Sequence, residues 1–264
     1  MTHLHHDTTC DHLFHGRIIL HQNAKGHRAG TDAVLLAAAC PRVEQGTLID
    51  LGSGSGAVGL MAAFHNPHAC VVLVERDANA IELATHNIEA NSFSERMCVV
   101  EADILAPASQ NIAHGLKSEM ADVVLTNPPF FEQREGRMSP DSLRRGAHHM
   151  VDHPMCGQSN KAVQSGLERW VKTACRILKP HGHILMIHRA DAIPALIDTF
   201  QGRFGAITIT PIYPRANINA HRVLIRAIKG SRAPFQMTPP LVLHDAQGNF
   251  TPCIDAMHRG DACF

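Results

Sequence analysis

Several features are scarce in this sequence of 264 residues, and each absence excludes a class of protein. No apolar run reaches the roughly 18 to 20 residues that a membrane-spanning helix needs, and the polar N-terminus has no hydrophobic signal core. The 8 cysteines include no C-x-x-C pair, so we predict reduced, buried thiols and no metal site. We therefore expect a cytoplasmic protein that does not contact membranes.

Net charge and aromatic residues are also limited. The 24 basic and 24 acidic residues cancel, so no overall basic excess indicates a nucleic-acid partner. Residues 203–232 nevertheless contain six basic residues and no acidic one. One Trp and one Tyr are too few for an extended base-stacking platform.

Histidine, by contrast, is abundant, with 20 residues in the chain. Because residues 1–15 are polar and rich in histidine, we predict a flexible tail there. A single domain over residues 16–264 is predicted to follow. No feature of the sequence indicates an oligomeric state.

Apolar strands alternate with helices along most of the chain. Strands are predicted at 47–51, 70–74, 97–100, 122–126 and 183–188, and helices at 31–39, 57–65, 78–91 and 161–178. Two further strands, at 207–212 and 223–228, have no helix between them, which indicates an antiparallel hairpin. The pattern predicts an α/β fold with a seven-stranded, mostly parallel sheet, helices on both faces and an antiparallel C-terminal hairpin.

A glycine-rich loop follows the first strand of this sheet, in the sequence Asp50-Leu-Gly52-Ser-Gly54-Ser-Gly56. Glycine lets a backbone turn sharply and approach a ligand closely. The residues from Gly54 onward also satisfy the dinucleotide pattern G-x-G-x-x-G, so the pattern alone leaves two kinds of nucleotide ligand open. Counted from Gly52, directly after the strand, the spacing is G-x-G-x-G behind an acid. This arrangement resembles the S-adenosylmethionine loop of class I methyltransferases, whose ligand carries an ammonium group and no pyrophosphate.

Two acidic residues stand at the ends of the next strands. Glu75 closes the second strand, where an acid is placed to accept hydrogen bonds from ribose hydroxyls. Asp103 follows the third strand, where it can accept a hydrogen bond from an adenine amino group. The structural alternatives are a solvated strand-end acid for Glu75 and a helix N-cap for Asp103. With the glycine loop upstream, we predict that both acids bind the cofactor.

The sequence Asn127-Pro128-Pro129-Phe130 ends the fourth strand. An exocyclic amine is a poor nucleophile because its lone pair is delocalised, so a site that methylates it must localise the pair. The Asn127 side-chain oxygen and the Pro128 carbonyl can accept hydrogen bonds from the two N–H groups of the amine, in a geometry that proline restrains. Phe130 can stack on a base. The alternative is a Pro-rich turn with a core Phe, but the upstream loop and acids favour a catalytic role for Asn127, Pro128 and Phe130.

The glycine loop and the Asn127–Phe130 motif are together similar to those of the amino-methylating branch of class I S-adenosylmethionine-dependent methyltransferases, which have a methyltransferase small domain and a Rossmann-like fold. Residues 30–36, 127–133 and 221–224 further resemble the bacterial tRNA1(Val) adenine-37 N6-methyltransferase group. The resemblance implies S-adenosyl-L-methionine as cofactor and adenine N6 in tRNA as methyl acceptor. It also implies cofactor contacts from Asp32, Asp50, Gly52, Gly54, Gly56, Glu75, Asp103 and Asn127.

Other methyl acceptors, and a function without catalysis, remain open at this point. Phe130 stands where that group usually has Tyr, and N-P-P-F is common among guanine N2 methyltransferases of ribosomal RNA. Protein-glutamine N5-methyltransferases have a similar motif but place a helical substrate-binding domain before the glycine loop, and only 49 residues precede Asp50 here. An S-adenosylmethionine-binding adaptor without activity is the non-enzymatic alternative, but it would not need the two acceptors at Asn127 and Pro128.

Two basic segments are the predicted RNA-binding surfaces. Residues 131–160 directly follow Phe130, and residues 203–232 contain the second set of cations. A solvated loop and a pair of edge strands with protective cations are the respective structural alternatives. The arginines predicted to bind phosphates around a flipped base are Arg134, Arg137, Arg144, Arg145, Arg215 and Arg222.

Overall fold

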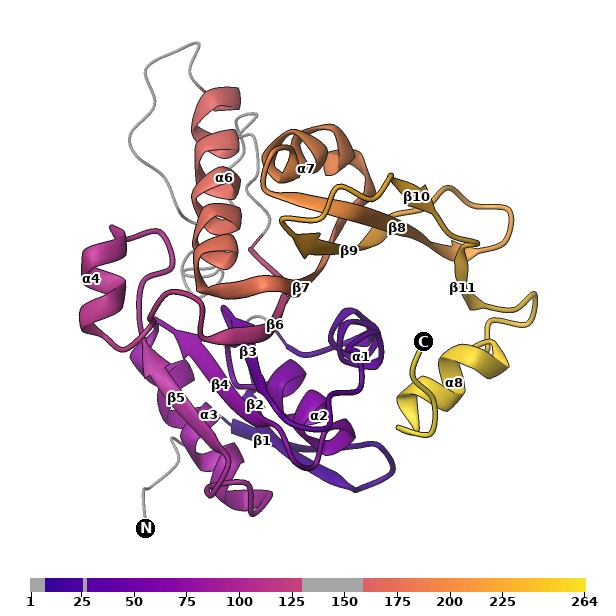
Figure 1. Ribbon diagram of the computed structural model, residues 1–264. Coiled ribbons are helices and arrows are strands. Elements are labelled where there is room, and N and C mark those ends of the chain that lie inside the picture. Colours follow the sequence, from indigo (N-terminus) through magenta and orange to yellow (C-terminus); the bar gives the residue numbers. More distant parts are fainter. Residues whose placement is uncertain (1–7, 26–27, 130–158) are drawn as a thin grey trace.

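The computed structural model describes residues 8–25, 28–129 and 159–264, and a nine-stranded sheet forms its centre (Figure 1). The strands follow the order β10-β8-β9-β7-β6-β3-β4-β5, and β11 also pairs with β8. Within the described residues, no helix has the length and apolar character needed to cross a membrane. The strands are β3 (Thr47–Leu51), β4 (Cys70–Glu75), β5 (Met97–Glu101), β6 (Ala121–Thr126), β7 (Leu178–Arg189), β8 (Phe204–Arg215), β9 (Arg222–Lys229), β10 (Gln236–Met237) and β11 (Leu241–His244).

The direction of the strands confirms the α/β class predicted from the sequence. Strands β3 to β7 are parallel, and β9 runs antiparallel between β7 and β8. All seven predicted strands are present, but the predicted number of strands is wrong, because β10 and β11 pair in parallel with the outer edge of β8. β10 contains only two residues, so it carries too little hydrophobic periodicity to be recognised from the sequence.

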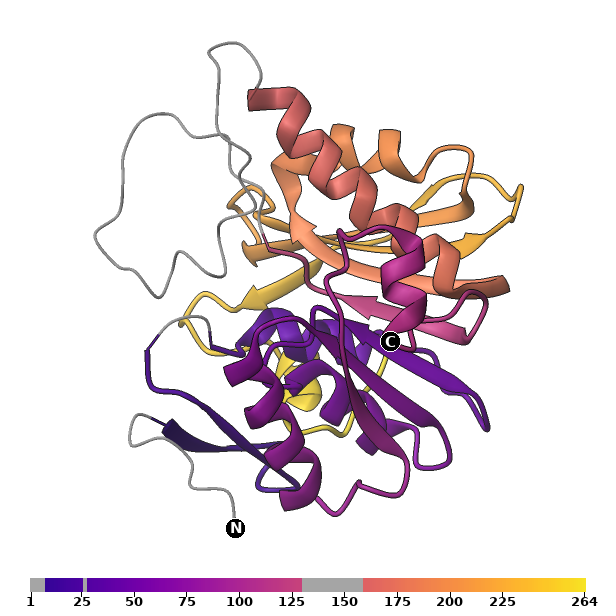
Figure 2. The ribbon, with the colours of Figure 1, turned by 90° about the vertical axis from the view of Figure 1, so that its left-hand side faces the viewer.

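Helices cover both faces of the sheet because its central strands are apolar on both sides (Figures 1 and 2). Leu48 and Leu73 belong to the core on one face, and Ile49 and Val74 to the core on the other. The first face is covered by α1 (Thr31–Ala38), α2 (Ala57–His65) and α3 (Ala78–Ala90), and the second by α6 (Ser159–Ile177) and α7 (Ile193–Phe200). The helix α4 (Ala108–Ala113) lies between β5 and β6 in the chain, and the short η1 (Ala190–Ala192) precedes α7.

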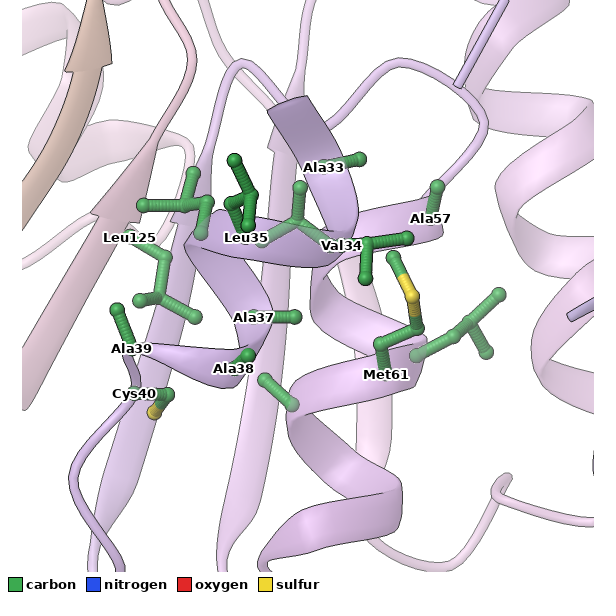
Figure 3. Packing of buried hydrophobic residues seen from close by; sticks show 14 of the residues in the cluster. Ala33, Val34, Leu35, Ala37, Ala38, Ala39, Cys40, Ala57, Met61 and Leu125 are labelled. Atoms are coloured by element: carbon green, nitrogen blue, oxygen red, sulfur yellow. The ribbon is translucent and has the colours of Figure 1, made fainter. Parts of the chain in front are cut away.

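Small residues let α1 and α2 pack closely on the sheet (Figure 3). Ala33 and Ala37 of α1 lie in the same buried cluster as Ala57 and Met61 of α2, together with Leu125 of β6. Alanine loses no side-chain entropy on burial and favours the helical conformation. The start of α1 is therefore held on a rigid base close to the end of the sheet.

The predicted flexible tail over residues 1–15 is wrong for residues 8–15. Strands β1 (Thr8–Leu13) and β2 (Ile18–Asn23) form an antiparallel hairpin, and Phe14 in its turn is only 1% exposed. The polar composition of this segment indicated a tail, but its backbone pairs with β2, which lies outside residues 1–15, in a register that runs from Thr8 and Asn23 to Leu13 and Ile18. Residues 1–7 lie outside the described residues.

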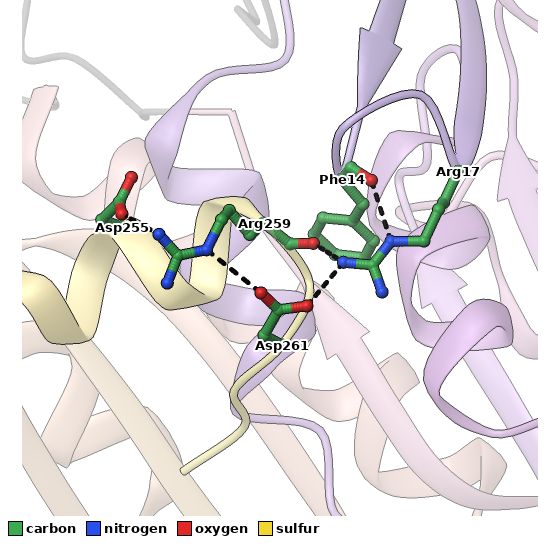
Figure 4. Close-up of polar contacts among 5 residues, drawn as sticks. All are labelled: Phe14, Arg17, Asp255, Arg259 and Asp261. Carbon is green, nitrogen blue, oxygen red and sulfur yellow. Dashed lines mark hydrogen bonds and ion pairs between the residues drawn. The ribbon is translucent and has the colours of Figure 1, made fainter.

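The C-terminal helix α8 (Pro252–His258) joins the two ends of the described chain (Figure 4). The Arg17 guanidinium forms an ion pair with Asp261 at 2.7 Å and donates to the Phe14 carbonyl at 2.9 Å. Arg259 contacts Asp255 and Asp261. These groups are partly exposed, so they contribute specificity of docking more than stability.

Candidate active site

The motifs singled out in the sequence meet at one edge of the sheet. Because β3, β4, β5 and β6 are parallel, their carboxyl ends lie together. The strand order reverses at β3, with β4 and β5 on one side of it and β6 and β7 on the other. The helices after β3 and β6, α2 and α6, accordingly pack on opposite faces. In an open α/β sheet, such a reversal leaves a crevice for a ligand outside the strand ends.

The glycines of the loop after β3 have two different roles: two allow close packing, and one leaves the backbone open to a ligand. Gly52, Gly54 and Gly56 have φ values of 80°, 54° and 90°, which only glycine adopts readily. A Cβ at Gly52 would lie 2.8 Å from the Trp170 ring, and one at Gly56 would lie 2.8 Å from Leu73. A Cβ at Gly54 would meet no atom within 4 Å. Gly52 and Gly56 therefore allow close packing, whereas the Gly54 backbone faces open space.

Glu75, at the end of β4, holds the tip of this loop. Its Oε2 accepts a hydrogen bond from the Gly54 N–H at 2.9 Å. Its Oε1 accepts from the N–H groups of Arg76 at 2.8 Å and Asp77 at 3.1 Å. Each carboxylate oxygen has two lone pairs, so Oε2 retains one that can accept a hydrogen bond from a ribose hydroxyl. The solvated strand-end alternative therefore does not describe Glu75, which is half-buried and bonded on both oxygens.

Asp50 lies behind the loop, near the end of β3, and is 2% exposed. Its Oδ2 accepts a hydrogen bond from the Gly59 N–H in the first turn of α2, at 2.8 Å. Burial raises the pKa of Asp50 to about 7, against the lowering effect of the Gly59 hydrogen bond, and the charge of Glu75 raises it further. The contact seen for Asp50 thus fixes α2 on β3. Its predicted contact with the cofactor stays a prediction.

Asp103 shapes the turn after β5. Its Oδ1 accepts a hydrogen bond from the Leu105 N–H at 3.0 Å, and its Oδ2 lies 3.5 Å from the Arg76 guanidinium. The N-cap alternative is wrong, because α4 begins only at Ala108. The Asp103 side chain is 41% exposed, so its carboxylate is accessible to a ligand. The predicted contact with adenine stays a prediction.

Asn127 and Pro128 directly follow β6, across the reversal of strand order from the glycine loop. Pro128 is buried and Asn127 is half-buried. The structure therefore brings the two main motifs to neighbouring strand ends, as the sequence predicts. Five other predicted site residues lie outside the described residues: Phe130, Arg134, Arg137, Arg144 and Arg145.

Asp32 and Arg222 form an ion pair, whereas the predicted partners were the cofactor for Asp32 and RNA for Arg222. The Arg222 Nε donates to the Asp32 Oδ2 at 2.9 Å, and both side chains are mostly buried. The pair joins the start of α1 to the start of β9. Arg215 is exposed at the end of β8, which is parallel to β7 and therefore ends at the same edge as the site.

Asn87 of α3 and Asn91, the C-cap of that helix, attach the N-terminal hairpin to the site, and neither was predicted from the sequence. Asn91 exchanges two hydrogen bonds with the backbone of Ile19, at 2.8 and 2.7 Å. Asn87 does the same with His21, at 2.7 and 2.9 Å, and its amide also donates to the Ser55 carbonyl in the glycine loop. The i,i+4 spacing of asparagines on a helix was the available signal, because it matches alternate residues of a strand.

Trp170 and Thr126 were also missed as site residues. The Trp170 indole N–H donates to the Thr126 Oγ1 at 2.9 Å, and the Thr126 hydroxyl donates to the Leu51 carbonyl at 2.7 Å. All three residues are buried beneath the crevice. No local pattern connects residues that are 44 and 75 positions apart, so only the fold could identify this contact.

The residues at this edge fit S-adenosylmethionine. The open Gly54 backbone and the Glu75 and Asp103 carboxylates can accommodate an adenosine without a pyrophosphate. The Ser53 hydroxyl is buried and has no hydrogen-bond partner among the described residues, so this loop retains an unused polar group. In the same residues, no cluster of three or more His, Cys, Asp or Glu side chains could hold a metal ion.

An α/β sheet with its antiparallel strand between the last two parallel ones, and with a glycine loop and strand-end acids at the order reversal, defines the class I S-adenosylmethionine-dependent methyltransferases. Residues 27–154 match the methyltransferase small domain. The tRNA1(Val) (adenine(37)-N6)-methyltransferase of Aeromonas hydrophila is 30% identical over 228 residues, which cover 85% of each chain. The enzyme of the same name from Porphyromonas gingivalis is 28% identical over 247 residues and 89% of each chain.

A solved structure from Agrobacterium tumefaciens, described as a predicted O-methyltransferase, is similar over the same region. It is 31% identical, with a TM-score of 0.71, and the match covers 88% of this chain and 98% of that one. The chain therefore belongs to the methyltransferase small-domain family of S-adenosylmethionine-dependent methyltransferases. It is an enzyme of this class, and S-adenosylmethionine is its cofactor. The resemblance found in the sequence is confirmed.

Proposed function

We propose that this enzyme methylates the N6 amine of adenine in tRNA. The observation that carries the proposal is the position of Asn127 and Pro128, directly after β6 and across the order reversal from the glycine loop. An amine held there faces the ligand crevice. The tRNA (adenine-N6)-methyltransferase names of the relatives support this acceptor. A tRNA substrate also leads us to propose a cytoplasmic location.

In this proposal the protein mainly positions the reactants. S-adenosylmethionine supplies an activated methyl group on its sulfonium, so little acid or base catalysis is needed. The Asn127 side-chain oxygen and the Pro128 carbonyl accept hydrogen bonds from the two N–H groups of the amine and thereby localise its lone pair. Phe130 stacks on the base. The cofactor is held by the Gly54 backbone, flanked by Gly52 and Gly56, with Glu75 on the ribose, Asp103 on the adenine, and Asp32 and Asp50 supporting the methionine end.

RNA phosphates would be bound by arginines around this edge. Arg215 is exposed at the end of β8, within the stretch of residues 203–232 that has no acidic residue. Arg222 is a weaker candidate, because its charge is already compensated by Asp32 at 2.9 Å. The arginines of residues 131–160 are proposed on their sequence position after Phe130.

A second candidate is the N2 amine of guanine, and the Phe130 side chain is the observation that favours it. Both amines present two N–H bonds, so Asn127 and Pro128 would act in the same way on either base. A hydroxyl as methyl acceptor has only one O–H group, so it would leave either the Asn127 oxygen or the Pro128 carbonyl without a hydrogen bond. Because the A. tumefaciens structure is described as a predicted O-methyltransferase, the test below also distinguishes methylation of nitrogen from methylation of oxygen.

The test is methyl transfer from labelled S-adenosylmethionine to tRNA, ribosomal RNA and protein from cells that lack the enzyme. Mass spectrometry of the nucleosides identifies the product. We expect N6-methyladenosine in tRNA. N2-methylguanosine in ribosomal RNA would support the second candidate instead, and label found only in protein or on an oxygen would overturn both.

Two variants test the role of the Asn127 side chain. Asn127→Ala should lower methyl transfer by about 100-fold or more, because it removes one of two preorganised acceptors, while the affinity for S-adenosylmethionine changes much less, because the glycine loop, Glu75 and Asp103 still bind the cofactor. Gln110→Ala is the matched control, because it removes an exposed amide from α4. Equal activity of Asn127→Ala and the wild-type enzyme would contradict the catalytic assignment.

A further inference from the structure

A chain of two buried hydrogen bonds joins α6 to β6 and β3. The Trp170 indole N–H donates to the Thr126 hydroxyl oxygen at 2.9 Å, and that hydroxyl donates to the Leu51 carbonyl at 2.7 Å. Thr126 and Leu51 are 0% exposed and Trp170 is 4% exposed. Each group thus makes its hydrogen bond away from water, where an unpaired polar group is costly. The geometry of the chain is therefore tightly defined.

This chain of hydrogen bonds lies at the point where the strand order reverses. The register between β3 and β6 runs from Leu48 and Val123 to Asp50 and Leu125, and goes no further. One residue beyond this register, the Thr126 hydroxyl donates to the Leu51 carbonyl and connects the two strands there. The next residues along the two strands are Asn127 and Gly52, which begin the two loops of the active site. The hydroxyl of Thr126 thus bridges the last fixed positions before both loops.

Trp170 also contacts the glycine loop directly through packing. A Cβ at Gly52 would lie 2.8 Å from the edge of the Trp170 ring, so the ring lies directly against the Gly52 backbone. The positive φ of Gly52, 80°, brings the backbone into this position. The indole therefore supports the cofactor loop with its ring and reaches the strand before Asn127 with its N–H.

We propose that Trp170 and Thr126 are positioning residues, which together set the separation between the cofactor loop and the amine-binding Asn127. Methyl transfer depends steeply on the alignment of donor and acceptor, and an error of about 1 Å can lower the rate 100-fold. Neither residue needs to touch the substrate. The assignment of Asn127 to the amine rests on the proposed function, but the coupling between Trp170 and the cofactor loop does not.

Thr126→Val and Thr126→Ser form the matched pair of variants that tests the proposal. Valine has nearly the shape of threonine but no hydroxyl, whereas serine keeps the hydroxyl and loses a methyl group. We expect Thr126→Val to lower kcat at least 10-fold with less than a threefold change in the Kd for S-adenosylmethionine. Thr126→Ser should restore kcat to within about threefold of the wild type. Trp170→Phe removes the N–H together with the indole edge that lies against Gly52, so it should lower kcat at least as much as Thr126→Val.

A second measurement requires no methyl acceptor. Trp170 is the only tryptophan of the chain, so tryptophan emission reports on its surroundings alone. Addition of S-adenosylmethionine should change this emission with the same Kd that calorimetry gives. The change should persist in Thr126→Ser and be at least halved in amplitude at saturation in Thr126→Val. Urea unfolding of each variant establishes that it is folded, and Trp170→Phe replaces Thr126→Val in the kcat comparison if the valine variant is not.

The possible failures are distinguishable. Normal kcat in both Thr126→Val and Trp170→Phe would overturn the positioning role, as would an equal loss of kcat in Thr126→Ser and Thr126→Val. Binding of S-adenosylmethionine without any change in tryptophan emission would overturn the coupling to the glycine loop. If instead no RNA is methylated but the emission changes as expected, the proposed acceptor is wrong and the coupling stands.

Discussion

Replacement of Asp50 by Asn should stabilise the folded protein in a pH-dependent manner. Asn has the same shape and keeps an oxygen that accepts the Gly59 N–H bond, but it cannot ionise. Burial raises the pKa of Asp50 from its usual 3.8 to about 7 in the folded protein. The contribution of this carboxyl to folding stability is therefore fully present only below pH 3.8, and it is lost as the pH rises towards 7. Linkage gives a loss of about 2.5 kcal/mol between pH 5 and pH 7.5, which the Asn variant avoids.

The assay is urea unfolding of both proteins at pH 5 and pH 7.5, followed by the emission of Trp170. The advantage of Asp50→Asn should grow by roughly 2 to 3 kcal/mol between the two pH values. Asp198→Asn, on the exposed side of α7, controls for the change in net charge and should stay within about 0.5 kcal/mol of the wild type. A difference between Asp50→Asn and the wild type that does not vary with pH would refute the reasoning.

Three further substitutions have defined outcomes. Gly52→Ala should lower the affinity for S-adenosylmethionine at least 10-fold in calorimetry, because its Cβ would lie 2.8 Å from Trp170 at a φ of 80°; an unchanged affinity would contradict this packing. Asn87→Ala should cost about 2 to 4 kcal/mol in urea unfolding, because it leaves the His21 backbone and the Ser55 carbonyl without partners; a cost below about 0.5 kcal/mol would show that the hairpin is not held this way. Burial lowers the pKa of His65 to about 4, aided by Arg42 and Arg17, so the folded state resists its protonation. The wild type should therefore lose about 3 kcal/mol more than His65→Phe between pH 7 and pH 4, and parallel pH profiles would exclude this cause.

The elements that the sequence predicted well are those with strong periodicity or clear boundaries. The strand 47–51 and the helix 57–65 have the predicted ends, since Gly46 and Gly52 flank the strand and Gly56, at φ 90°, starts the helix. Helices α4, α7 and α8 were missed, because each has six to eight residues and a window of about 11 to 18 residues mixes such a helix with its flanking loops. The strand β1 (Thr8–Leu13) was missed because its partners, such as Arg28 on Asp11, come from outside the strand.

The sequence by itself determined the class of this protein and the chemistry of its cofactor site. The glycine loop from Gly52, the acid at Glu75 and the motif at Asn127 are local patterns, because a sharp turn, a strand end and a restrained acceptor each depend on adjacent residues. Only the tertiary structure decided which side chains hold these motifs together. Trp170 with Thr126, Asn87 with His21, and Arg222 with Asp32 are separated by 44, 66 and 190 residues. Their contacts form only when the sheet order and the helix packing bring distant segments together, and no local pattern contains that information.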